Sequence, residues 1–248
     1  MCFKLGPMNA NPSPTLPEII LPLDLDTPRE AWRVIERIGG DLKWVKVGLQ
    51  MYLRWGDGFV KELAKEGFSI FLDLKLFDIP NTVASAIRSI GDLPVALTTL
   101  HTLGGVPMMR AAVEARDRLA PHIRLLGVTI LTSMDVATMN RVGIPGEVGF
   151  EVVRLAGLAR ESGVDGVVCS PQELGLLQAA GVGDLIFVTP GVRPADASAD
   201  DQSRIMTPGE AVRAGARYLV IGRPITAAPD PAAAFRAINE EMLQAFRA

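Results

Sequence analysis

The segment FSIFLDLKLFDIPNTV, residues 68–83, joins an apolar run to a cluster of charges. Its first half has no regular alternation of polar and apolar residues, which is the pattern of a strand buried on both faces of a parallel sheet. Asp73 and Lys75 follow directly, and Asp78 comes soon after them. A strand that only fills a core has no use for two carboxylates and an ammonium group, so the segment predicts a strand that ends at a functional site.

Seven other short apolar runs share this character, at residues 18–25, 42–48, 94–101, 123–131, 165–170, 184–191 and 217–222. The stretches between them, such as 28–39 and 146–163, repeat apolar residues every three or four positions, as amphipathic helices do. Eight alternating strand and helix units predict an α/β protein with a single-domain (β/α)8 TIM barrel over residues 18–248. Residues 1–17 are predicted to form a disordered or loosely held N-terminal tail.

Three helix starts carry the same signal. A hydroxyl residue is followed by proline and, two positions further on, by glutamate, at Thr27, Ser170 and Thr207. This arrangement lets side chains bond the free amides of the first helical turn. An open doubly wound sheet is the alternative fold, but no G-x-G-x-x-G follows the first apolar run, where acidic residues stand instead.

The composition excludes several classes of protein. With 25 Lys and Arg against 28 Asp and Glu, the net charge is −3, and no basic run exists to follow a nucleic acid backbone. The two cysteines, Cys2 and Cys169, lie far apart, which argues against a disulfide scaffold or a structural zinc site. No signal peptide and no transmembrane stretch is recognisable. The sequence therefore predicts a cytoplasmic protein without nucleic acid or membrane partners.

In a (β/α)8 barrel the active site lies at the carboxyl ends of the strands. The polar residues predicted at these ends are Asp24, Lys46, Asp73, Lys75, Asp78, His101, Thr132, Arg193 and Arg223. Asp73 and Lys75, two positions apart on one strand, should share a face and point into the barrel mouth. Asp78 lies past the strand end, before an Ile-Pro turn that directs it elsewhere.

Each of these charges taken alone is typical of a solvated strand end. Taken together, alternating lysines and aspartates satisfy one another and keep Lys75 protonated beside developing negative charge. His101 is a candidate acid or base, although a structural hydrogen bond is the favoured interpretation. Met108, Met109 and Cys169 are interpreted as core residues without chemistry.

A second cluster follows the last predicted strand. Gly222 lets a backbone amide approach an anion, and the guanidinium of Arg223 suits phosphate oxygens. A surface arginine in a Gly-Arg-Pro turn is an equally good interpretation of the same residues. Arg193 and Gln202 lie at the two ends of the long segment 190–204, which we interpret as a lid over the anion.

These residues also occur in motifs. The signature D-x-K-x-x-D-I-P-x-T is unbroken from Asp73 to Thr82. Six further motifs occur elsewhere in the chain, two before this signature and four after it: LDLD (23–26), VKVG (45–48), LTSM (131–134), VTPGVRP (188–194), DQSRIMTP (201–208) and VIGRPIT (220–226). In these features the chain resembles the orotidine 5′-phosphate decarboxylase family, bacterial type 1, from about Glu18 to the C-terminus. The resemblance implies a homodimeric carboxy-lyase that makes UMP at the last step of de novo pyrimidine biosynthesis, with neither metal nor organic cofactor.

The resemblance also implies roles for individual residues. Lys75 is expected to protonate C6 of the pyrimidine, with Asp73 beside the departing carboxylate. Lys46 completes the charged array and touches the ribose, and Asp24 binds a ribose hydroxyl. Asp78 and Thr82 are expected to reach the active site of the neighbouring subunit. The remaining substrate contacts fall to Thr132 at the base and to Arg193, Gln202, Gly222 and Arg223 at the phosphate.

Three rival hypotheses remain. A sugar-phosphate decarboxylase or aldolase of the same superfamily shares the Asp-x-Lys-x-x-Asp strand but requires magnesium. A Schiff-base mechanism on Lys75 requires an unprotonated amine, which the flanking carboxylates disfavour. A non-catalytic phosphate-binding barrel would keep Gly222 and Arg223 but would have no use for Asp73 and Lys75.

Overall fold

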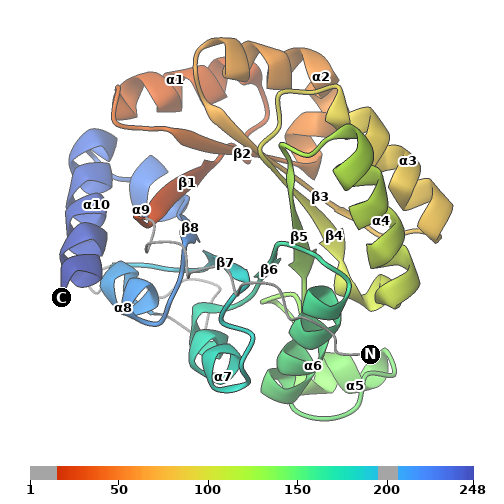
Figure 1. Ribbon diagram of the computed structural model, residues 1–248. Helices are drawn as coiled ribbons and strands as arrows, with labels where there is room; N and C mark the ends of the chain where they lie inside the picture. The colour runs from red at the N-terminus through yellow and green to blue at the C-terminus, as the bar shows by residue number, and fades with distance from the viewer. Residues whose placement is uncertain (1–15, 195–205) are drawn as a thin grey trace, which may run out of the picture.

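The protein forms a closed barrel of eight parallel strands, seen in a computed structural model that describes residues 16–194 and 206–248 (Figure 1). The strands follow one another around the barrel in chain order, and β8 pairs with β1 to close it. They are β1 (Glu18–Pro22), β2 (Trp44–Gly48), β3 (Ser69–Leu76), β4 (Leu97–His101), β5 (Arg124–Val128), β6 (Gly166–Val168), β7 (Ile186–Pro190) and β8 (Tyr218–Val220). Each strand lies within one of the eight predicted runs or extends one residue beyond it, so the predicted barrel is confirmed and the open sheet is wrong.

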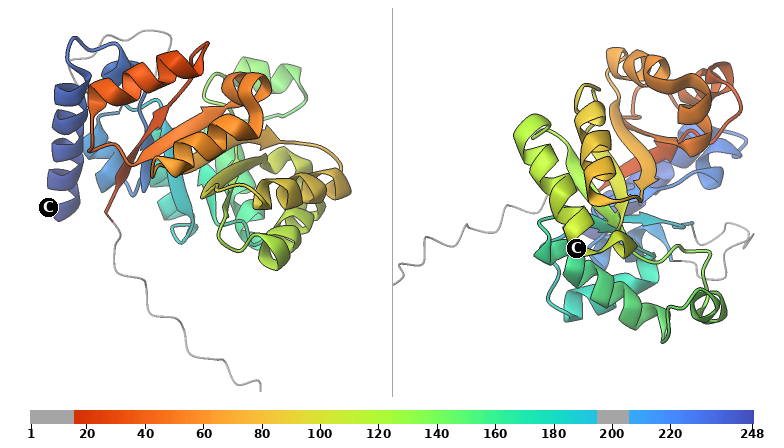
Figure 2. Two further views of the ribbon diagram at one scale, coloured as in Figure 1. Left: turned by 90° about the horizontal axis from the view of Figure 1, so that it is seen from above. Right: turned by 90° about the vertical axis from the view of Figure 1, so that its right-hand side faces the viewer.

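Helices surround the barrel. They are α1 (Pro28–Ile38), α2 (Leu49–Lys65), α3 (Pro80–Gly91), α4 (Gly105–Leu119), α5 (Val136–Arg141), α6 (Val148–Glu161), α7 (Leu174–Ala179), α8 (Pro208–Arg213), α9 (Arg223–Thr226) and α10 (Pro231–Arg247). The views of Figure 2 show α3 and α4 side by side, and α10 packs against α1 to complete the ring. None of the helices in the described part of the chain is long and apolar enough to cross a membrane.

The three predicted helix starts are confirmed. At α1, the hydroxyl of Thr27 accepts a hydrogen bond from the amide of Glu30 at 3.2 Å, and the Glu30 carboxylate accepts one from the amide of Thr27 at 3.0 Å. Thr207 and Glu210 repeat this capping box at α8. Ser170 opens a 3-10 turn, Pro171–Glu173, which leads into α7. Each box satisfies two amides that the helix itself leaves unbonded.

The core has two layers. The large outer cluster lies between the strands and the helices, and a small inner cluster fills the barrel itself. The fully or nearly fully buried members of the inner cluster are Ile20, Phe71, Leu97, Leu126, Val188 and Tyr218. Because the strands are buried on both faces, their sequences show no polar and apolar alternation until the charged residues at the barrel mouth.

Gly166 in β6 is needed for close strand packing. A Cβ atom at this position would overlap the backbone carbonyl oxygen of Ile186 in the neighbouring strand β7. The backbone of a paired strand cannot rotate away as a flexible side chain can. The barrel therefore requires a residue without a side chain at this position.

We predict that Gly166→Ala lowers the free energy of unfolding by ~2 kcal/mol or more, because β6 and β7 must separate to accept the methyl group. Gly157→Ala is the matched control. Gly157 lies inside α6 with no atom near its hypothetical Cβ, so alanine should stabilise the helix by up to ~1 kcal/mol. Urea unfolding followed by circular dichroism measures both. Equal stability of the two variants would contradict the packing argument.

Candidate active site

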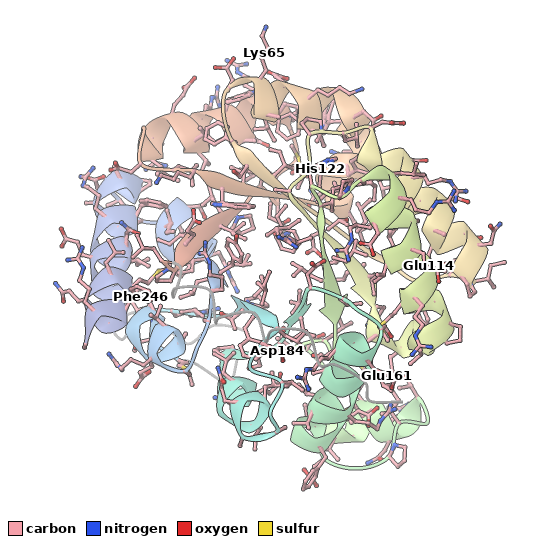
Figure 3. The ribbon with its side chains drawn as sticks, in the orientation of Figure 1. Lys65, Glu114, His122, Glu161, Asp184 and Phe246 are labelled. Atoms are coloured by element: carbon pink, nitrogen blue, oxygen red, sulfur yellow. The ribbon has the colours of Figure 1, made fainter. Side chains whose placement is uncertain are left out.

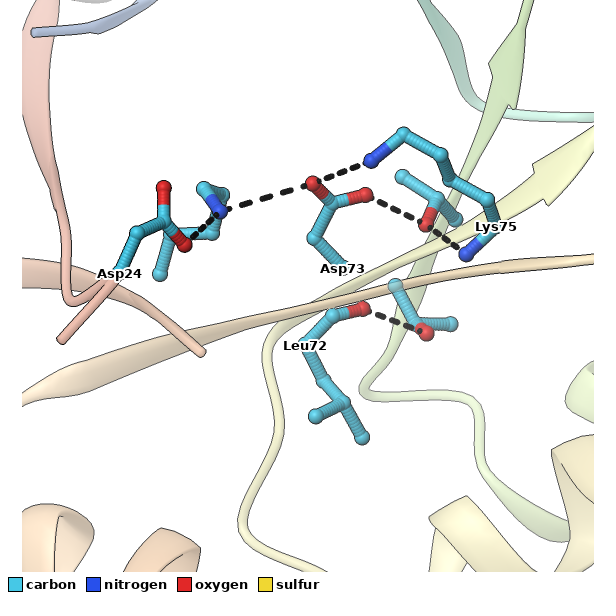
Figure 4. A network of polar contacts seen from close by, with 7 residues as sticks. Asp24, Leu72, Asp73 and Lys75 are labelled. Carbon is cyan, nitrogen blue, oxygen red and sulfur yellow. Dashed lines mark hydrogen bonds and ion pairs between the residues drawn. The ribbon is translucent and has the colours of Figure 1, made fainter. Parts of the chain in front are cut away.

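Four charged side chains form a continuous chain of ion pairs at the carboxyl ends of β1 to β3 (Figure 4). The ammonium group of Lys46 lies 3.0 Å from Asp24 and 3.7 Å from the Oδ2 atom of Asp73. The same Oδ2 atom lies 2.7 Å from the ammonium group of Lys75. The structure thus brings together the predicted residues Asp24, Lys46, Asp73 and Lys75 in the alternating order that the sequence suggested.

The exposure of these side chains increases toward both ends of the chain. Those of Lys46 and Asp73 are only 11% exposed, whereas Lys75 is 35% and Asp24 is 56% exposed. A buried carboxylate between two ammonium groups is compensated electrostatically, while an isolated one would be very costly. The array therefore holds two positive charges in fixed positions and leaves its outer carboxylate open to a ligand.

β3 is irregular where it carries these charges. Its register against β4 shifts between Leu72 and Leu76, and Lys75 adopts a φ of 50°, the left-handed region that residues other than glycine rarely use. Asp73 and Lys75 point into the same cavity, as expected from their spacing, but the strand between them is not the regular one that the expectation assumed. Strained backbone of this kind is often found at functional sites.

The array forms one wall of a cavity of about 190 Å³ in the barrel mouth. Lys46, Asp73, Lys75 and Thr132 supply its polar groups. The other lining residues are Phe71, Val128, Ile130, Leu131, Val168, Cys169, Pro190 and Val220. Apolar walls around fixed charges strengthen electrostatic interactions by excluding water.

Asp78 and Thr82 do not join the array. Both are exposed, and the Asp78 carboxylate accepts a hydrogen bond from the amide of Ile79 at 2.6 Å. Both lie at the turn that starts α3 at Pro80, and neither is among the residues that line the cavity. Phe77 and Ile79, on either side of Asp78, are 61% and 66% exposed. An apolar surface thus surrounds this carboxylate.

The predicted phosphate residues follow the neighbouring strands β7 and β8. Arg193 is 6% exposed, and its amide donates a hydrogen bond to the carbonyl of Met206 at 3.2 Å. Gly222 caps α9, and Arg223 is the exposed first residue of that helix. A Cβ atom on Gly222 would lie 3.0 Å from the ring of Pro22, so close packing against Pro22 is one reason for a glycine at this position. Gln202, and with it most of the predicted lid, lies outside the described residues.

His101 makes a structural hydrogen bond, which confirms the favoured interpretation. Its Nδ1 atom accepts a bond from the amide of Leu103 at 3.4 Å, and its ring centroid lies 5.6 Å from that of Phe77. Burial, and secondarily the positive charge of Lys75, lower the pKa of His101 below 6.5. The imidazole is therefore mainly neutral at pH 7. The three residues interpreted as core, Met108, Met109 and Cys169, are buried as predicted.

Two residues of the site were missed by the sequence analysis. Thr99 in β4 bonds both the carboxylate of Asp73 and the backbone of Lys75. Gly48 lies next to the outer ion pair. A Cβ atom on this residue would be only 3.0 Å from both Asp24 Oδ1 and Lys46 Nζ, so the pair needs the space that the glycine leaves. The available signals were weak: a threonine in an apolar strand, and a glycine at the end of the VKVG motif.

The barrel and the charged array at its mouth define a (β/α)8-barrel enzyme with an electrostatic active site. Residues 17–238 match the profile of the orotidine 5′-phosphate decarboxylase / HUMPS family. The chain therefore belongs to this family. The predicted family and the predicted class of enzyme, a carboxy-lyase, are both confirmed.

Relatives resemble the chain over nearly their whole length. The orotidine 5′-phosphate decarboxylase of Opitutus terrae is 51% identical over 225 residues, covering 91% of this chain and 98% of the relative. That of Nitrosococcus oceani is 46% identical and covers 90% and 97%. The crystal structure of the orotidine 5′-phosphate decarboxylase from Lactobacillus acidophilus superimposes with a TM-score of 0.81 at 37% identity, covering 94% of this chain and all of the other.

We predict that His101 titrates below pH 6.5 in the folded protein. Lys75→Ala should raise this pKa but leave it below the ordinary value, because burial is the larger cause. Since the unfolded chain binds the proton at its ordinary pKa, stability should fall as pH drops from about 6.5 to the lowered folded pKa. Imidazole NMR titration measures the pKa in both proteins, with His122→Gln as the variant that assigns the two signals, and urea unfolding at several pH values measures the stability. An unchanged His101 pKa in Lys75→Ala would contradict the assigned influence of Lys75.

Proposed function

We propose that the protein converts orotidine 5′-phosphate to UMP in the cytoplasm, at the last step of de novo pyrimidine biosynthesis, with Lys75 as the proton donor. Membership of the family supports the decarboxylation. The observation that carries the mechanism is the ammonium group of Lys75, held 2.7 Å from Asp73 at the wall of a largely apolar cavity.

In this reaction the bond between C6 of the pyrimidine and the carboxylate carbon breaks, and carbon dioxide leaves. The electron pair that remains at C6 lies in the ring plane and cannot delocalise into the π system. Stabilisation must therefore come from fixed charge nearby. Lys75 supplies that charge and then its proton, which forms the new C6–H bond, and the amine regains a proton from solvent.

Asp73 has two tasks in this proposal. Its carboxylate fixes the ammonium groups of Lys75 and Lys46. It also lies where the substrate carboxylate must enter, and repulsion between the two would favour loss of carbon dioxide, although the array's electrostatic stabilisation carries more weight. Lys46 and the half-exposed Asp24 are the ribose contacts, because they form the outer end of the array.

The base and the phosphate occupy opposite ends of the site. Thr132 at the cavity wall contacts the base. Arg193, Gln202, Gly222 and Arg223 bind the phosphate. The guanidinium groups suit phosphate geometry, and the loops after the last two strands are the usual phosphate site of such barrels. Binding energy from this remote group drives closure of the predicted lid and lowers the barrier at C6.

The protein acts as a homodimer in which each subunit completes the other's site. Asp78 and Thr82 are exposed and do not line their own cavity, and the exposed Phe77 and Ile79 nearby favour a buried subunit interface. In this arrangement Asp78 extends the charged array of the partner, beside its lysine proton donor.

We predict that Lys75→Ala lowers kcat by ~10³-fold or more, because it removes both the fixed charge and the proton. Binding of UMP should change by less than ~10-fold, since the phosphate and ribose contacts remain. Loss of ultraviolet absorbance of orotidine 5′-phosphate measures turnover. Lys65→Ala, an exposed lysine at the end of α2 that points away from the barrel (Figure 3), is the control and should keep full activity.

The same assay separates the rival chemistries. Activity should persist in EDTA, and borohydride should trap no covalent adduct on Lys75. Wild-type turnover in Lys75→Ala would refute the proposed proton donor, and loss of activity in EDTA would favour the magnesium-dependent rival.

The shared site leads to a complementation test. Lys75→Ala and Asp78→Ala dimers should each be inactive. Mixed dimers should contain one doubly altered site and one intact site, because the two residues serve different cavities. Unfolding and refolding the two variants together should restore about a quarter of wild-type activity if subunits pair at random. Recovery in the mixture without dimers on gel filtration, or no recovery despite mixed dimers, would contradict the proposal.

A further inference from the structure

We propose that Thr99 is a positioning residue that sets the geometry of both Asp73 and Lys75 through a single hydroxyl group. The proposal rests on the role proposed above for Lys75 as proton donor. Thr99 lies in β4 and is fully buried, with 0% exposure. It contacts two members of the charged array without being an ionisable group itself.

The first contact fixes the backbone of Lys75. β3 and β4 are in register at Phe71 with Leu97, but further on Leu76 pairs with Leu100, so β3 carries extra residues between these points. Within this irregular segment the amide of Lys75 donates a hydrogen bond to the Thr99 hydroxyl at 2.8 Å. That bond supports the left-handed conformation of Lys75, the only positive φ outside glycine in the described residues.

The second contact fixes the carboxylate of Asp73. The Thr99 hydroxyl donates a hydrogen bond to the Oδ1 atom at 2.9 Å, while the Oδ2 atom faces Lys75 at 2.7 Å and Lys46 at 3.7 Å (Figure 4). One oxygen is thus reserved for a neutral donor and the other for the two ammonium groups. The rotation of the carboxylate, and with it the position of the Lys75 ammonium group, depends on Thr99.

Only a hydroxyl can make both contacts from one atom, because it donates one hydrogen bond and accepts others. Valine has the same shape but can do neither. The site is fully buried, so loss of the hydroxyl leaves an amide and a carboxylate oxygen without their partner. A displacement of the proton donor by a fraction of an ångström is then expected to slow the chemistry more than it weakens binding.

Thr98 provides a matched control on the same strand. It is also fully buried, and its hydroxyl donates a hydrogen bond at 2.9 Å to the backbone carbonyl of Leu72, the residue before Asp73. Within the part of the chain that the structure describes, its hydroxyl bonds no charged residue of the array. Thr98→Val therefore removes a buried hydroxyl from the same strand pair without touching the array.

The test compares steady-state kinetics and thermal unfolding of four variants. Thr99→Val should lower kcat by about 10- to 100-fold and change KM by less than ~3-fold. Thr99→Ser should return kcat to within ~3-fold of wild type, because serine keeps the hydroxyl. Thr98→Val should keep kcat within ~3-fold while losing thermal stability to a similar extent as Thr99→Val. Lys75→Ala is measured in parallel.

A kcat of Thr99→Val within threefold of Thr98→Val would overturn the proposal, and so would a Thr99→Ser variant as slow as Thr99→Val. If Thr99→Val does not fold, Thr99→Ala replaces it in the same comparison with serine. Full turnover by Lys75→Ala would instead refute the role of Lys75 as proton donor. This failure can be told apart from a failure of the Thr99 proposal, because it does not depend on the kcat values of the Thr99 and Thr98 variants. If Thr99→Val and Lys75→Ala are slow and Thr99→Ser is active, the results support both the proton donor Lys75 and the positioning role of Thr99.

Discussion

The Oδ2 atom of Asp73 faces the ammonium groups of Lys46 and Lys75, at 3.7 and 2.7 Å, within the mouth of the barrel. Burying the carboxylate of Asp73 alone would be costly, and the two ammonium groups compensate its charge. Much of the local structure serves this cluster. Gly48 leaves space under the outer pair, the irregular end of β3 brings Lys75 back toward Asp73, and the apolar wall keeps the local dielectric low.

Most of the barrel was predictable because its signals are local. Strands buried on both faces leave unbroken apolar runs, and capping boxes at Thr27, Ser170 and Thr207 mark helix starts within four residues. The meeting of Asp73 and Lys75 was also predictable, since both lie on one strand. The association of these two with Lys46 and Asp24 required only that neighbouring parallel strands end at the same rim.

The remaining features depend on contacts between distant segments. Nothing near Thr99 distinguishes it from Thr98, and both hydroxyls are buried; only the shifted pairing of β3 and β4 makes one a partner of the array. The positive φ of Lys75 likewise contradicts the regular strand that its sequence indicates. The role of Asp78 is of another kind, because among the described residues its carboxylate bonds only the amide of its neighbour Ile79, and a role in the neighbouring subunit stays a prediction.

The inner apolar cluster also determines how molecules enter and leave. Phe71 and its neighbours fill the barrel below the charged array, so the cavity has a floor and is not a channel. Substrate, carbon dioxide and nucleotide product must therefore all use the same opening.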